Sequence, residues 1–144
     1  MLDHAWIAAH IPHQGRMCLL DRVLSWDEQQ VCCVAQGHQA ADHPLRAEGR
    51  LGIAAGIEYA AQAMAVHGVL LAGGGHPLGV GYLTSVRNVC LHADRLDDVP
   101  GELTVRATRL SGDDALILYQ FDLTAGDRCL IEGRASVVLD AHRS

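Results

Sequence analysis

The sequence predicts an α+β protein in which one long buried helix packs against an antiparallel sheet. The stretch from Ile53 to Val69 is apolar on nearly every side, and a helix of this kind must be buried. Gly73-Gly74-Gly75 ends the helix, and apolar residues then alternate with polar ones, which is the period of half-buried strands. The connections between these later strands are short, so we expect an antiparallel meander that packs as a layer on the helix.

Length and composition fit one globular domain over residues 1–144. Hydrophobic residues make up 49% of the chain and charged residues 19%, which is typical of a folded protein with a substantial core. The net charge of −6 argues against nucleic acid as the main partner, because phosphate binding needs a basic surface. The five cysteines and an amino terminus without the pattern of a secretory leader predict reduced thiols in a cytoplasmic protein.

The elements before the long helix are less regular. Met1–Ala9 has one apolar side and predicts a short helix. Residues 11–24 begin as a loop, because of Pro12 and Gly15, and then become apolar. Residues 31–36 predict a strand, and a loop rich in glycine, histidine and aspartate leads into the helix.

Four strands are expected after the helix, and they cover Val80–His92, Glu102–Leu110, Ala115–Thr124 and a last segment that ends at Leu139. Turn residues at 112–114 and 125–127 separate the last three strands. In the final strand, strict alternation places Cys129 beside Ile131 on one face and Glu132 on the other.

Polar residues inside the apolar helix are the first functional candidates. Glu58 is costly to desolvate there and needs a partner or a task. Gln62 lies one turn farther along the same face and is expected to orient Glu58. The run Ile53–Ala72 has the length of a membrane span, but these two polar residues favour a protein core. His43 lies 15 residues before Glu58, and a histidine with an acid is the usual pair for general acid–base chemistry.

Three motifs, in the same order, resemble the 3-hydroxyacyl-acyl-carrier-protein dehydratases of the hot-dog fold. Ile-Pro-His through Asp-Arg-Val at 11–23 resembles the opening motif, and Ile-Glu-Tyr-Ala-Ala-Gln at 57–62 resembles the helix signature. The stretch 81–102, which ends in Pro-Gly-Glu, resembles the family's segment that ends in Pro-Gly-Asp. Within the family, the chain is most similar to the small dehydratase-like subunits of aryl-polyene-type pathways. The resemblance implies one long helix wrapped by a highly curved antiparallel sheet.

The resemblance also implies a catalytic site. It carries the family acid to Glu58 and the family histidine to His43, with His38 as a second candidate. His43 would remove the C2 proton of a 3-hydroxyacyl thioester, and Glu58, its pKa raised by burial, would protonate the leaving hydroxide to give the trans-2-enoyl product. Backbone N–H groups at Gly52 and Ile53 are expected to bind the thioester oxygen as it gains charge.

The implied partners follow from the same family. Acyl carrier protein would deliver the acyl group on its phosphopantetheine arm, and no metal or other cofactor is required. The family's active site spans a two-fold dimer, with histidine from one chain and acid from the other. The partner is therefore an identical chain or a related hot-dog subunit, in a dimer or a higher oligomer, and neither nucleic acid nor a membrane is expected.

Other interpretations remain open at this stage. A hot-dog thioesterase would use the same acid to direct water at the carbonyl carbon. A non-catalytic acyl-binding or partner subunit fits the replacement of the family's Pro-Gly by Gly52-Ile53. Glu58 and His43 could also be structural, with His43 capping the turn before Pro44. A metal site at Cys32, Cys33, His38 and His43 matches no tight zinc spacing.

Overall fold

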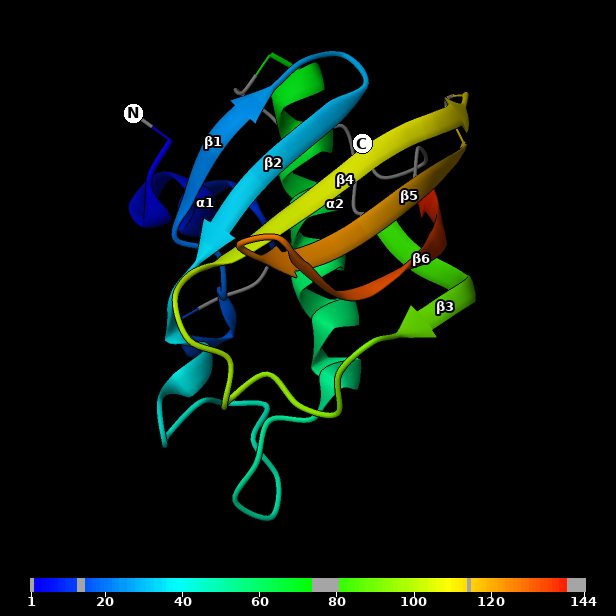
Figure 1. Ribbon diagram of the computed structural model, residues 1–144. Coiled ribbons are helices and arrows are strands. Elements are labelled where there is room, and N and C mark those ends of the chain that lie inside the picture. Colours follow the sequence, from blue (N-terminus) through cyan, green and yellow to red (C-terminus); the bar gives the residue numbers. More distant parts are fainter. Residues whose placement is uncertain (1, 13–14, 74–80, 114, 140–144) are drawn as a thin grey trace.

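The computed structural model describes residues 2–12, 15–73, 81–113 and 115–139. A six-stranded antiparallel sheet curls around one long helix, α2 (Gly56–Leu71), as Figure 1 shows. The strands are β1 (Arg22–Trp26), β2 (Gln30–Ala35), β3 (Gly81–Leu91), β4 (Leu103–Gly112), β5 (Leu116–Ala125) and β6 (Arg128–Leu139). A short helix, α1 (His4–His10), precedes them, and single 3₁₀ turns occupy Gly15–Met17, Gly37–Gln39 and Ile53–Ala55. The predicted α+β architecture is confirmed.

The strand order is β1-β2-β4-β5-β6-β3, so the expected four-strand meander is only partly correct. β4, β5 and β6 do form a meander, but β3 lies beyond β6 at the edge opposite β1 (Figure 1). The segment between Leu91 and Leu103 is a long crossover rather than a turn, and it passes the start of α2. The sequence also gave no signal for β1, because four of its five residues are exposed and it shows no apolar alternation.

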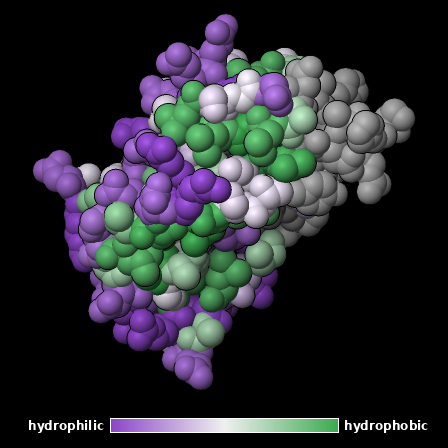
Figure 2. Space-filling view, turned by 90° about the vertical axis from the view of Figure 1, so that its right-hand side faces the viewer, coloured by the Kyte–Doolittle hydropathy of each residue, from purple (hydrophilic) through white to green (hydrophobic). Residues whose placement is uncertain are grey.

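The β3 edge of the sheet carries apolar side chains at the surface. β3 is 11 residues long and pairs only with β6 among the described strands. Figure 2, which views the molecule from the side of β3 and β6, shows apolar side chains gathered there between polar ones. The large exposed hydrophobic residues of β3, β5 and β6 are Leu83, Leu91, Leu116 and Val138. A long apolar edge of this kind is a surface that proteins normally cover with another strand or subunit.

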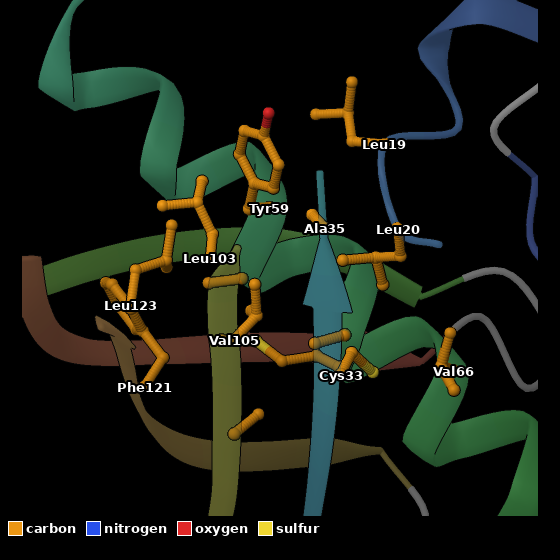
Figure 3. Packing of buried hydrophobic residues seen from close by; sticks show 14 of the residues in the cluster. Leu19, Leu20, Cys33, Ala35, Tyr59, Val66, Leu103, Val105, Phe121 and Leu123 are labelled. Carbon is orange, nitrogen blue, oxygen red and sulfur yellow. The ribbon is translucent and has the colours of Figure 1, made fainter. Parts of the chain in front are cut away.

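The core lies between α2 and the inner face of the sheet. Leu103, Val105 and Phe121 project from β4 and β5 toward the helix, as the close view in Figure 3 shows. Gly56 brings the helix start directly against β6, because a Cβ at this position would lie 2.8 Å from Cγ2 of Ile131. Among the described residues, one helical run is long and apolar enough to cross a membrane, and 61% of it is buried in the protein, as expected of a core helix.

A bulge in β6 changes one face assignment. The β5–β6 register slips by one residue near the start of β6, so one residue of β6 is extra. Leu130 is fully buried, as is its neighbour Ile131, and Cys129 turns to the outer face, where its Sγ lies 3.8 Å from Oε2 of Glu132. The expectation that Cys129 shares a face with Ile131 is therefore wrong, because alternation cannot anticipate a bulge.

Candidate active site

The crossover between β3 and β4 holds the segment that leads into α2. The carboxylate of Asp97 accepts a hydrogen bond from the N–H of Leu51 at 3.0 Å. It also pairs with the guanidinium groups of Arg95, at 2.6 Å, and Arg46, at 3.4 Å. The hydrogen bonds from Arg95 are the main reason that the pKa of Asp97 lies well below its usual range. The start of α2 is therefore fixed from outside the helix.

Gly52 and Ile53, the predicted substrate-binding residues, lie in this fixed segment. Gly52 bridges to Arg95, and the N–H of Ile53 donates to the carbonyl of Asp94 at 3.0 Å. The Ile53 N–H therefore already has an acceptor and can bind a thioester oxygen only if that bond is given up. Their substrate-binding role stays a prediction. Beside them is a surface cavity of about 580 Å³, lined by Arg50, Ile53, Leu91, His92, Ala93, Asp94, Arg95, Asp98 and Arg128.

Glu58 and Gln62 form a polar pair in the first half of α2. The fully buried side-chain amide of Gln62 accepts a hydrogen bond from the N–H of Leu19 at 2.8 Å. Its NH₂ group donates to the carbonyl of Met17 at 2.6 Å and to Oε2 of Glu58 at 2.9 Å. The predicted contact between Gln62 and Glu58 is confirmed, and it fixes the Glu58 carboxyl group relative to the loop that precedes β1.

Glu58 differs from its buried neighbours on the helix. Its side chain is only partly exposed, whereas Gln62 and Tyr59 are buried. A carboxyl group that is oriented by an amide and still reaches the surface can exchange a proton with a molecule bound there. This arrangement is what a general acid requires, and the catalytic role of Glu58 itself stays a prediction.

His43 is buried and its ring is held at both nitrogens. Nδ1 accepts a hydrogen bond from the N–H of Leu45 at 3.1 Å, as in a residue that caps its own turn. Nε2 lies 3.0 Å from the hydroxyl of Tyr59. Because Nδ1 is the acceptor, the proton of the neutral ring is on Nε2, which donates to Tyr59. Burial, followed by the nearby charge of Arg46, lowers the pKa of His43, which favours this neutral form.

Tyr59 connects the turn of His43 to α2 and was not predicted as a site residue. It directly follows Glu58 in the helix signature, but within an apolar helix it reads as a core aromatic residue. The useful signal was its hydroxyl group, because a buried tyrosine normally needs a hydrogen-bond partner. Burial raises the pKa of Tyr59, so the hydroxyl stays protonated.

The second histidine candidate, His38, has a structural position. Its ring is fully buried, and Nε2 donates to the carbonyl of Val99 at 2.8 Å, which ties the loop after β2 to the β3–β4 crossover. Of the proposed metal ligands, Cys33 is fully buried in the core, where burial raises its pKa to about 12. The hydrogen bonds that already hold His38 and His43 do not favour a metal site at these residues.

The far end of α2 carries a second polar network that the sequence did not assign. His67 is fully buried, and its Nε2 donates to the carbonyl of Asp27 at 2.8 Å. Its Nδ1 accepts a hydrogen bond from the hydroxyl of Tyr119 at 2.7 Å. Burial lowers the pKa of His67 and raises that of Tyr119 to about 12, so both groups stay neutral.

The helix-in-sheet arrangement and the polar face of α2 define a hot-dog protein. A subunit in "The Dehydratase Heterocomplex ApeI:P from Xenorhabdus doucetiae" is similar in structure, with a TM-score of 0.80 and 20% identity over 92% of this chain and 90% of that chain. A thioesterase from Haemophilus influenzae is similar with a TM-score of 0.59 and 15% identity, over 81% of this chain and 76% of that chain. A hypothetical thioesterase with coenzyme A from Streptococcus pneumoniae gives a TM-score of 0.61 and 13% identity, over 85% and 88%.

The family follows from the sequence match. The model of the ApeP-like family, described as ApeP dehydratase, matches residues 5–142, and this chain therefore belongs to the ApeP-like dehydratase family. No curated protein sequence matches the chain. The resemblance to dehydratase-like subunits of aryl-polyene-type pathways, and with it the hot-dog fold, is confirmed.

Proposed function

We propose that this chain is the acid-bearing subunit of a hydro-lyase that converts a 3-hydroxyacyl thioester, carried on acyl carrier protein, to the trans-2-enoyl thioester. The observation that carries the proposal is Glu58, a partly exposed carboxyl group fixed by Gln62 on the central helix. Membership of the ApeP-like dehydratase family supports this reaction class over others available to the fold. The chemistry needs no cofactor: a base removes the C2 proton, the electron pair forms the C2–C3 double bond, and the C3–O bond breaks as an acid protonates the departing hydroxide.

Glu58 is suited to the leaving-group side of the reaction. Elimination requires a proton on the departing hydroxide, and we propose that the carboxyl group of Glu58 donates it. The amide of Gln62 donates to Oε2 of Glu58 at 2.9 Å and so directs the carboxyl group. Preorganisation of this kind reduces the entropic cost of proton transfer in the transition state.

The base must be a histidine with an accessible lone pair, and the hydrogen bonds of His43 do not leave it one. Both nitrogens of His43 are engaged, and the acceptor nitrogen is held by the N–H of Leu45. His43 can remove a C2 proton only if its turn releases Leu45 and the ring exchanges tautomers. We propose that a related subunit supplies a histidine whose lone pair is accessible. The hydrogen bonds of His43 therefore favour a heterodimer, in which the partner supplies the base.

The β3 edge is the surface that we propose for this partner. Among the described strands, its outer edge pairs with none, and it carries exposed apolar side chains such as Leu83 and Leu91. Both features favour continuation of the sheet into a second hot-dog subunit. The heterocomplex of the similar structure supports a partner of this kind. The location expected for such a complex is cytoplasmic, where acyl carrier protein is found.

The test compares the chain alone with the chain mixed with a related hot-dog subunit from the same source. Each sample receives a 3-hydroxyacyl thioester on acyl carrier protein, and enoyl formation is followed by its ultraviolet absorbance. The proposal predicts enoyl product in the mixture and little from this chain alone. Free thiol is measured in the same samples, because a thioesterase would release thiol.

The outcomes separate the alternatives. Enoyl formation by the chain alone would refute the need for a partner, and its loss in His43→Ala would then identify His43 as the base of a homodimer. Thiol release without enoyl product would favour the thioesterase. A mixture that forms a complex but yields neither product would leave an acyl-binding or scaffolding role and refute the proposed reaction.

A further inference from the structure

We propose that His92, Cys129 and Glu132 form a zinc-binding site at the junction of β3 and β6, separate from Glu58 and His43. Nε2 of His92 lies 2.8 Å from Oε2 of Glu132, and Sγ of Cys129 lies 3.8 Å from the same oxygen. All three ligand atoms are within 4.8 Å of one another. Among the residues the structure describes, no other set of three such groups meets this distance criterion.

The distances suit zinc. Tetrahedral Zn²⁺ binds sulfur at about 2.3 Å and nitrogen or oxygen at about 2.0–2.2 Å, so its ligand atoms lie roughly 3.3–3.7 Å apart. The separation of Cys129 Sγ from Glu132 Oε2, 3.8 Å, is already close to this value. The hydrogen-bonded pair of His92 and Glu132 would open by roughly half an ångström when zinc replaces the shared proton. Imidazole and thiolate together select zinc over magnesium or calcium.

Two bulges bring these residues to one face. On β6, the bulge at Leu130 turns Cys129 to the face that carries Glu132. On β3, a second bulge shifts the register after Arg87, and Asn88 adopts a φ of 54° there. A non-glycine residue in this left-handed conformation carries a backbone cost. Without these two shifts, regular alternation would not bring the three ligands together.

Asp122 provides an independent observation at the same place. It lies on β5 directly opposite Glu132 in the antiparallel register. Its Oδ1 is buried and, among the described residues, has no hydrogen-bond partner. Both carboxylates act electrostatically on the thiol of Cys129, and a divalent cation would offset their combined negative charge. We expect the buried Oδ1 of Asp122 to accept a hydrogen bond from a water molecule that completes the coordination of zinc.

The site has a structural consequence for the sheet. His92 follows the last residue of β3, and its N–H donates to the carbonyl of Leu130 at 2.9 Å. A metal held by His92 and by two residues of β6 would therefore clamp the end of the edge strand. His92 also lines the cavity beside Ile53, so the clamp would fix one wall of that cavity.

The test measures zinc binding directly. The full chain, without an affinity tag, reduced and stripped of metal, is titrated with Zn²⁺ in competition with a chromophoric chelator. We expect one zinc per chain. Cys129→Ser and His92→Asn should each weaken binding by more than about a hundredfold, which exceeds the usual effect of changing a neighbour of a ligand. Cys90→Ser is the matched control, because Cys90 is an exposed cysteine whose Sγ contacts the carbonyl of Asn88. The zinc affinity of this variant should change by less than roughly threefold, because no ligand is lost.

Cobalt substitution reports the thiolate ligand without relying on a variant. Wild type and Cys90→Ser loaded with Co²⁺ should show a sulfur-to-cobalt charge-transfer band, and Cys129→Ser should lack it. Thermal unfolding of each variant verifies that it is folded. Equal zinc affinity in the wild type and Cys129→Ser, loss of the band in Cys90→Ser, or failure of the wild type to show the band would each overturn the proposal.

Discussion

Each half of α2 carries a buried polar side chain, but the groups that these two side chains contact differ in their exposure to solvent. At the far end, His67 is fully buried and both ring nitrogens have partners in Asp27 and Tyr119. Near the start, Gln62 is equally buried, but it holds Glu58, which is partly exposed. The closed network of His67 and Tyr119 is buried and can only stabilise the fold, whereas Gln62 orients an ionisable group that is partly exposed. The difference shows that a polar residue in a core helix becomes a functional candidate when it orients an ionisable group that is partly exposed.

The largest stability effect is expected for Gln62→Leu. The change removes the partners of the Leu19 N–H and the Met17 carbonyl and should cost about 2–4 kcal/mol in the free energy of unfolding. It also releases Glu58, so dehydration should slow in addition. Denaturant unfolding and the enoyl assay measure the two effects.

Tyr119→Phe is the matched control for Gln62→Leu, because it breaks a hydrogen bond of the closed network at the other end of α2. It should lower stability by about 1–3 kcal/mol and leave the dehydration rate of the folded protein unchanged. If Tyr119→Phe slowed dehydration as much as Gln62→Leu does, the conclusion that only the Gln62–Glu58 pair affects catalysis would be wrong.

The pH dependence of stability should come from the buried histidines. The pKa of His67 is lowered by burial, and that of His43 is lowered for the same reason. The unfolded chain therefore binds more protons below about pH 6.5, and stability falls as pH decreases through this range. Each histidine contributes a slope of at most about 1.4 kcal/mol per pH unit.

Urea unfolding between pH 8 and pH 5 measures this slope. A His67→Asn variant should show a shallower dependence than the wild type, because the more deeply buried of the two groups no longer titrates. An unchanged slope would mean that His67 is not the neutral, buried base that its hydrogen bonds indicate.

The smallest effect is expected for Tyr59→Phe. This change removes the hydrogen bond between Nε2 of His43 and the tyrosine hydroxyl and should lower stability by about 1 kcal/mol. If the partner supplies the base, dehydration by the heterodimer should fall by less than about threefold, because neither Tyr59 nor His43 then transfers a proton. If the complex forms fully but the dehydration rate falls much more than threefold, His43 acts in catalysis after all and the partner is not the source of the base.

Sequence patterns predicted the features that depend on local chemistry. The presence of the long helix, the strands with strong alternation and the Glu58–Gln62 contact follow from periodicity and helix geometry. The helix was expected at Ile53–Val69, and the structure has a 3₁₀ turn at Ile53–Ala55 followed by α2 at Gly56–Leu71. The position of β3 could not be predicted, since strand order depends on long-range packing. The outward position of Cys129 could not be predicted, because it depends on a bulge in β6. The hydrogen bonds of His43 to Leu45 and Tyr59 could not be predicted either, because they depend on the three-dimensional shape of the turn that holds His43.

The role of Glu58 as the general acid is tested most directly by replacing the wild-type chain with Glu58→Gln in the assembled complex. The quantity measured is the rate of enoyl formation. Glutamine keeps the shape and the hydrogen bond to Gln62 but cannot donate an acidic proton. We expect a loss of about 10²–10⁴-fold in kcat, the usual contribution of a general acid, with unchanged complex formation. Glu102→Gln, which changes an exposed carboxylate in the same way, is the control. A Glu58→Gln complex that forms enoyl product at the wild-type rate would contradict this role of Glu58.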